Sequence, residues 1–181
     1  DNDTLALLLK DELQERAVVR ALLDFGLREW DSERTTADYF FEEMIEEDLF
    51  DNKDLYAIIR LYKQFYEERA EPDARSFLYN ENEQIRNLVI AVMDFPYEIS
   101  PKWKEEYEMP VHTREEMYRE EIISTLGYLK LRKIKRLIAQ NQQDLEKETD
   151  PERQLVLIKT HQHLKEMEKD IIQKAGTVIL K

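Results

Sequence analysis

The most constraining feature of this sequence is a long stretch that contains almost no helix breakers. Between Thr113 and Pro151, Gly127 is the one residue that is either glycine or proline. Thr113 and Glu116 have the spacing of a capping box, in which each side chain bonds a free amide of the first helical turn, so we expect a helix to begin there. A helix of about 35 residues is about 50 Å long, more than a compact domain of this size requires. The stretch therefore predicts an extended arm.

A second long helix is expected to fold back on the first. Asp150 followed by Pro151 is typical of a helix start, and Gly176 is typical of a helix end. Apolar residues in both segments are spaced alternately three and four apart, as in a short antiparallel coiled coil. The predicted stripe contains Ile122, Ile123, Leu126, Leu129, Ile134, Leu137, Ile138 and Leu145 in the first helix, and Leu157, His161, Leu164, Met167 and Ile171 in the second.

Composition predicts an all-α fold. The 181 residues include only 3 Gly and 5 Pro, which are the two residues that most disfavour helix. Residues 1–112 hold 13 Lys and Arg against 28 Asp and Glu, a net charge of −15, whereas residues 113–181 hold 14 against 12, a net charge of +2. We therefore expect two parts: an acidic helical bundle subdomain over residues 1–110 and a long C-terminal antiparallel helical hairpin over residues 111–181.

Within the acidic part, apolar periodicity predicts several shorter helices. They are expected at about 12–25, 35–47, 53–69 and 81–93, with one helical turn at 76–78 and a proline-containing linker over 94–110. Gly26 ends the first helix, Thr35 or Thr36 caps the second, and Asp51 or Asn52 caps the third. The expected core includes Leu13, Val18, Leu22, Phe25, Tyr39, Phe40, Met44, Ile45, Leu55, Ile58, Ile59, Tyr62, Ile85, Leu88, Val89 and Val92.

Several classes of protein are disfavoured by what the sequence lacks. It has no cysteine, so it forms no disulfides and no thiolate metal sites, which is compatible with the cytoplasmic location that we expect. No apolar run approaches the 18 residues of a membrane span, and the N-terminus lacks the pattern of a signal peptide. Because the chain begins at Asp1 without a methionine, we expect it to be a piece of a longer protein.

Residues that could support catalysis do not form a recognisable set. His161 and His163 are two apart on a helix and point to different sides, and His161 falls on the apolar stripe. Glu42, Glu43, Glu46 and Glu47 are interpreted as a solvated acidic face, because no Glu-x-x-His pair accompanies them. No phosphate-binding loop, nucleophile elbow or zinc-protease motif is present. We expect no catalytic residue, metal or cofactor; an enzyme would need carboxylates that face inward in one bundle.

Two short segments have more than one interpretation. The basic cluster Lys130–Arg136 has three interpretations. It is the solvated face of a long helix, a binding site for an acidic partner or for the acidic body of its own chain, or a nucleic-acid site. The apolar tail Val178–Leu180 either covers the open end of the hairpin or anchors a partner. Gly127 is a candidate hinge, since glycine costs about 1 kcal/mol relative to alanine inside a helix.

The order of these parts resembles the C-terminal helicase-binding domain of bacterial DnaG-type DNA primase. The resemblance covers nearly the whole chain and rests on pattern and order. The stretches that carry it are Gln14–Leu23 (QERAVVRALL), Phe50–Ile59 (FDNKDLYAII), Phe65–Glu68 (FYEE) and Leu164–Asp170 (LKEMEKD), followed by the end of the hairpin.

The resemblance implies a non-catalytic interaction domain that binds the hexameric replicative helicase and brings primer synthesis to the replication fork. It implies a helicase contact centred on the hairpin. From the acidic charge of residues 1–112 and the lack of a long apolar run, we expect little or no contact with nucleic acid and none with membrane. From their positions on the last helix and the tail, we expect the contact residues to be Lys165, Lys169, Ile172, Lys174, Val178, Ile179 and Leu180. The alternatives are the N-terminal domain of the helicase itself, which the bundle of this family resembles, and an unrelated helical adaptor or coiled-coil dimerisation module.

Overall fold

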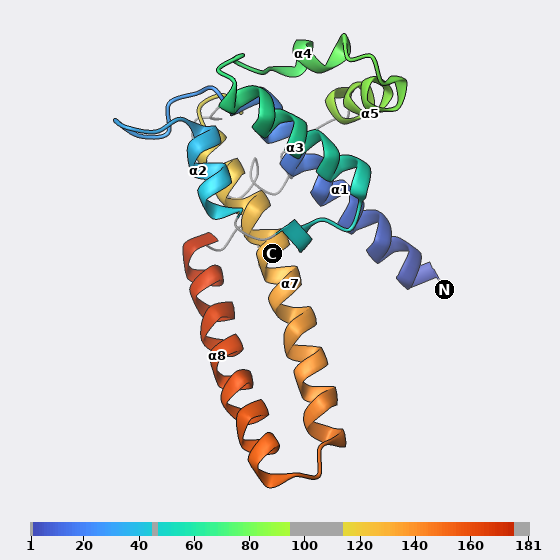
Figure 1. The fold of residues 1–181 in the computed structure, drawn as a ribbon, viewed down its shortest axis with the longest axis vertical. Helices are drawn as coiled ribbons and strands as arrows, with labels where there is room; N and C mark the ends of the chain where they lie inside the picture. The colour runs from blue at the N-terminus through green and yellow to red at the C-terminus, as the bar shows by residue number, and fades with distance from the viewer. Residues whose placement is uncertain (1, 45–46, 95–113, 176–181) are drawn as a thin grey trace, which may run out of the picture. The chain divides into compact units, whose positions relative to one another are not determined.

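The fold is built from helices alone in the part of the chain that the structure describes. The structure, a computed structural model, describes residues 2–44, 47–94 and 114–175. Its α-helices are α1 (Asn2–Phe25), α2 (Thr36–Glu43), α3 (Lys53–Glu67), α4 (Ala74–Leu78), α5 (Glu83–Asp94), α7 (Tyr118–Lys147) and α8 (Pro151–Ala175), with a short 3-10 helix at Glu47–Leu49 (Figure 1). The predicted all-α class is confirmed.

The chain divides into two compact units, Asp1–Ile122 and Ile123–Lys181. The division falls within α7, whereas the boundary expected from charge, near residue 110, lies outside the described residues. Each unit has its own internal organisation.

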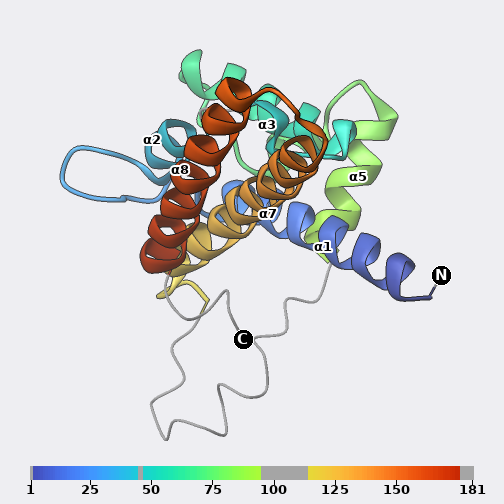
Figure 2. The same cartoon turned by 90° about the horizontal axis from the view of Figure 1, so that it is seen from below.

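In the first unit, α1 is the central helix. It contacts α2, α3 and α5, and α5 in turn contacts α3 and α4 (Figure 2). Apolar side chains on α1 to α5 form a core that excludes water, and their burial is the main stabilising contribution to folding. The fully buried members of this core include Val18, Val19, Leu22, Phe40, Leu55, Ile58, Tyr62, Phe77, Val89 and Val92.

Local hydrogen bonds determine where these helices begin. Thr35 forms a capping box with Asp38 at the start of α2, and the Asn52 side chain accepts from the amides of Asp54 and Leu55 at the start of α3. The sequence predicted both starts. Asp73 forms a second capping box, with Ser76, at the start of α4, and the segment predicted as a single turn is a short helix of 5 residues.

Three expectations for the first unit were wrong. Helix α1 begins at Asn2 rather than near residue 12, and Leu13, expected in the core, is 40% exposed. Helix α2 ends at Glu43 instead of continuing to about residue 47, because the Met44 backbone has left helical geometry. Ile45 lies outside the described residues.

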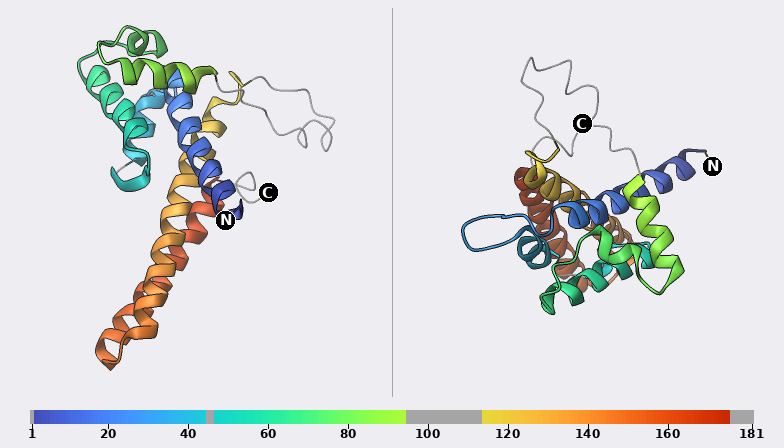
Figure 3. Two further views of the ribbon diagram at one scale, coloured as in Figure 1. Left: turned by 90° about the vertical axis from the view of Figure 1, so that its right-hand side faces the viewer. Right: turned by 90° about the horizontal axis from the view of Figure 1, so that it is seen from above.

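In the second unit, α7 and α8 form the predicted antiparallel hairpin (Figures 1 and 3). The turn between them is fixed by Glu148, whose carboxylate accepts from the amides of Thr149 and Asp150 at 3.1 Å. Gln154 donates to the Glu148 carbonyl at 2.7 Å and so ties the start of α8 to the turn. Helix α7 begins at Tyr118, later than expected, and continues through Gly127 without a break.

The seam between the two helices contains more polar residues than the apolar pattern predicts. Leu137 and Met167, expected in the seam, are 41% and 37% exposed. Their places are taken by Asn141, which is buried, and by Glu168, whose side chain is 16% exposed. The seam positions of α8 are buried or half-buried and alternate three and four residues apart: Gln154, Leu157, His161, Leu164, Glu168, Ile171 and Ala175. Ile172, beside this line, is half-buried as well.

Candidate functional site

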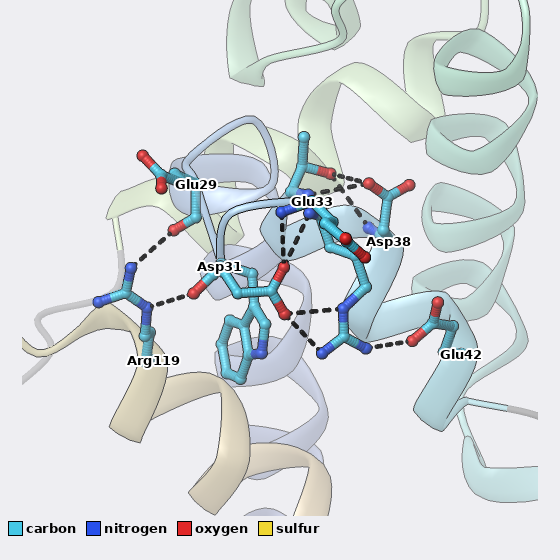
Figure 4. A network of polar contacts seen from close by, with 9 residues as sticks. Glu29, Asp31, Glu33, Asp38, Glu42 and Arg119 are labelled. Carbon is cyan, nitrogen blue, oxygen red and sulfur yellow. Dashed lines mark hydrogen bonds and ion pairs between the residues drawn. The ribbon is translucent and has the colours of Figure 1, made fainter.

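The densest polar cluster of the first unit lies in the loop between α1 and α2. Asp31 accepts from the amides of Glu33 and Arg34 at 3.0 and 2.9 Å, and its carboxylate also receives the Arg34 guanidinium at 2.7 and 2.9 Å (Figure 4). The hydrogen bond from Arg34 is the main reason that the pKa of Asp31 lies below its usual value. Arg34 also pairs with Glu42, and its hydrogen bonds to Asp31, first, and to Glu42 raise the pKa of Arg34.

Beside this loop, Asp38 connects α2 to α3. It accepts from the Thr35 amide at 2.8 Å and from the Tyr66 hydroxyl at 2.9 Å. Burial alone would raise the pKa of Asp38, but these hydrogen bonds, together with that of the Thr35 hydroxyl, hold it below the usual value. Burial raises the pKa of Tyr66. The side chains of Thr35, Asp38 and Tyr66 therefore connect α2 to α3 and are hydrogen-bonded to one another.

The segment that enters α7 is attached to the same loop by backbone carbonyls. The Arg119 guanidinium donates to the carbonyls of Glu29 and Trp30 at 3.1 and 2.9 Å (Figure 4). The Tyr118 hydroxyl also donates to the Glu29 carbonyl. The Trp30 ring stacks on Tyr39 with centroids 3.8 Å apart. These contacts fix the loop conformation.

A second ion-pair group is centred on Arg114, which bonds both Asp24 and Glu121. Burial raises the pKa of Glu121, and the Arg114 guanidinium opposes that effect. The pKa of Arg114 is raised by its two carboxylate partners, although burial acts in the opposite direction. These side chains hold the start of α7 to α1, which is a structural task.

None of these clusters has the geometry of a metal site. Among residues 2–44, 47–94 and 114–175, no three His, Asp or Glu side chains converge as ligands for one ion. The described part of the chain also contains no helix that is long and apolar enough to cross a membrane. His161 is half-buried on the seam and His163 is exposed, so the two point to different sides as predicted, and His112 lies outside the described residues.

The second unit presents a surface of a different kind. On α8, the residues that each follow a seam position by one form a second row beside the seam: Leu155, Ile158, Gln162, Lys165, Lys169 and Ile172. Leu155 is 53% exposed and Ile158 is 43% exposed, while Ile172 is half-buried. The spacing of the row alternates three and four, so its members form one continuous line along the helix. We call this line the outer row of α8.

The structure brings some of the predicted contact residues together and separates others. Lys165, Lys169 and Ile172 lie on the outer row, whereas Lys174 lies on the opposite flank of the seam in the last turn of α8. Val178, Ile179 and Leu180 lie outside the described residues. The row therefore unites three of the seven predicted positions.

Leu155 and Ile158 were missed by the sequence reasoning. Both belong to a second heptad pattern that is displaced from the seam by one residue, and this pattern could have been recognised in the sequence. It was overlooked because the seam positions Leu157 and Leu164 account for the apolar periodicity on their own.

Comparison with known proteins identifies the family. The chain belongs to a family described as a domain of unknown function (DUF8430), which matches residues 2–178. No curated protein and no solved structure matches the chain.

Proposed function

We propose that this chain is a non-catalytic protein-interaction domain of a DNA primase, which binds the hexameric replicative helicase and brings primer synthesis to the replication fork. The proposal combines the resemblance in four sequence stretches with one structural observation. That observation is a long hairpin, α7–α8, that exposes large apolar side chains on a regular helix face.

The polar groups of the first unit support a structural role for that unit. Asp31 is bonded within the loop between α1 and α2, and Asp38 and Arg114 join helices of the unit. The acidic charge of residues 1–112 also disfavours nucleic acid, which proteins bind chiefly with cationic side chains. The proposed partner is therefore a protein, in the cytoplasm, and the interaction needs no cofactor.

The proposed mechanism is non-covalent docking. Apolar side chains of the hairpin become buried against helices of the helicase, and lysine side chains orient the encounter more than they tighten it. Contacts that form and break in a working replication complex bury modest areas, and moderate affinity follows.

Co-elution of the purified chain with the helicase hexamer of the same organism tests the proposal, with mass determined by light scattering. We expect a complex that contains several copies of the chain per hexamer. A chain that elutes alone at every ratio contradicts the proposal. A chain that elutes as a dimer through its hairpin, without the helicase, favours the coiled-coil module instead.

A further inference from the structure

The outer row of α8 has the length and regularity of a helix-docking surface. From Leu155 to Ile172 it spans 17 residue steps, or about 25 Å at the rise of an α-helix. A partner helix of about the same length can lie along it, with its own heptad positions against the row. The length and spacing of the row therefore suit a partner helix.

Apolar side chains occupy both ends of the row. Leu155 and Ile158 are adjacent on the helix surface, and each exposes more than two-fifths of its area. Exposed apolar residues are common singly, but a pair on one face with a third, Ile172, on the same line is typical of a surface that a partner covers. The opposite flank has Val156 and Met167 with Thr160 and His163 between them.

Lysine side chains occupy the middle of the row. Lys165 is bonded to Glu168 at 2.8 Å, but its side chain remains 55% exposed. Lys169 follows one turn later and is also exposed. No residue of the outer row is acidic, so a helix that lies along it meets two positive charges about 6 Å apart.

We propose that the outer row of α8 docks an amphipathic helix of a partner protein that carries acidic residues opposite Lys165 and Lys169, flanked by apolar residues opposite Leu155 and Ile158 at one end and Ile172 at the other. Charge complementarity selects this occupant. The row itself presents two lysines and no acidic side chain to such a helix, whereas residues 1–112 carry a net charge of −15 and repel it.

The inference rests on the proposed function only in assigning the partner helix to the helicase. The chemistry of the row stands independently, so a designed probe can test it without the helicase. The probe is a fluorescent 21-residue helical peptide with leucine at its heptad positions and two glutamates placed to face Lys165 and Lys169. A second peptide with lysine in place of those glutamates is the matched control.

Fluorescence anisotropy with the full chain measures the binding of each peptide. We expect the wild-type chain to bind the acidic peptide saturably. The affinity of the double variant Lys165→Glu plus Lys169→Glu for the same peptide should be at least tenfold weaker. The same net change of charge in Lys147→Glu plus Arg153→Glu, which lies off the row, should leave binding within a factor of two. The inference is overturned if the wild-type chain shows no saturable binding of the acidic peptide at tens of micromolar. It is also overturned if the lysine variant on the row and the control variant off the row lose the same amount of affinity.

An apolar pair of variants tests the geometry of the row. Leu155→Asp plus Ile158→Asp should abolish binding of the acidic peptide, whereas Val156→Asp plus Met167→Asp, on the opposite flank, should preserve it. Circular dichroism checks that both variants remain folded, as expected for exposed positions. Loss of binding in the opposite-flank variant alone overturns the assignment to the outer row.

The same variants separate this inference from the proposed function. If the wild-type chain binds the helicase and the row variants bind it equally well, the inference fails and the proposed function stands. If the acidic peptide binds through the row but the helicase does not bind the chain, the proposed function fails and the row serves another acidic helix.

Discussion

The Tyr62 hydroxyl occupies the space that a side-chain carbon at Gly26 would fill. Gly26 ends α1, where its amide donates to the Leu22 carbonyl at 2.8 Å and its carbonyl accepts from the Ala37 amide at 2.8 Å. The glycine therefore lets α3 approach the point at which the chain leaves α1 and turns toward α2. The Tyr62 side chain is fully buried, and its hydroxyl has no hydrogen-bond partner among the described residues.

The first prediction follows from this close approach. Gly26→Ala should lower the free energy of unfolding by about 1–3 kcal/mol, the usual cost of overpacking a core. Tyr62→Phe should leave stability unchanged or raise it slightly, because the removed hydroxyl is buried without a partner. The double variant should recover part of the loss, which urea denaturation of the three proteins can measure. A Tyr62→Phe variant as unstable as Gly26→Ala would show that the hydroxyl has a stabilising role.

Glu15 supports the second prediction. Its side chain is 2% exposed and accepts from the amides of Asp51 and Asn52 at 2.7 and 3.0 Å, just before α3. Glu15→Ala should cost about 2–4 kcal/mol, because two amides lose their acceptor and a small cavity remains. Glu15→Gln retains one oxygen and should cost less. Equal losses in the two variants would assign the effect to the carboxylate charge instead of the hydrogen bonds.

Asn141 supports the third prediction, which concerns the register of the hairpin. It is 7% exposed in the seam, and its amide donates to the Leu157 carbonyl at 2.9 Å. A buried polar residue with a partner across a helix seam fixes register at some cost in stability. Asn141→Leu should therefore keep or raise the melting temperature while it permits more than one alignment of α7 and α8.

Distance measurement between spin labels on Gln140 and Lys159 can detect such alignments, since the chain has no cysteine of its own. The parent chain should give one narrow distance distribution, and Asn141→Leu a broadened or shifted one. Ile138→Leu, which changes a neighbouring seam position without a polar group, is the matched control and should remain narrow. A narrow, unshifted distance distribution for Asn141→Leu would show that Asn141 does not fix the register of the hairpin.

Asp38 supports the fourth prediction, which concerns pH. Its pKa in the folded chain is held below the unfolded value of about 3.9. The unfolded chain therefore binds more protons at this site, and the stability that Asp38 contributes is present above that value and is lost as the pH falls from about 5 through it. Asp38→Asn should lower stability at pH 7 by about 1 kcal/mol, through the weakened cap.

Thermal unfolding at a series of pH values checks this sign. The Asp38→Asn variant should lose less stability between pH 5 and pH 3 than the parent chain, because its amide does not titrate. Parallel curves for the two proteins would show that Asp38 is not linked to acid unfolding.

Local sequence signals predicted most of the fold. The capping residues Thr35 and Asn52 and the Asp150–Pro151 start were readable because they depend on neighbours a few residues away. The start of α7 was misplaced because Arg114 is held by Asp24 and Glu121, and the contact with Asp24 joins residues that are far apart in the sequence.

The seam and the candidate surface were harder to predict for a different reason. Periodicity places Met167 and Glu168 one residue apart on the same helix, and hydrophobicity favours the methionine as the buried residue. The structure places Glu168 in the seam, where it bonds Lys165 at 2.8 Å, and exposes Met167. Which of two adjacent heptad lines is buried depends on how α7 and α8 pack together. The apolar pattern of one helix does not contain that information.

The most direct test of the central claim is a calorimetric titration of the full chain into the purified replicative helicase hexamer of the same organism. The account predicts a saturable complex of micromolar or tighter affinity, lost in Leu155→Asp plus Ile158→Asp and retained in Val156→Asp plus Met167→Asp. The absence of any binding heat at tens of micromolar, together with no complex in the co-elution experiment, would contradict the assignment to the helicase-binding domain of a primase.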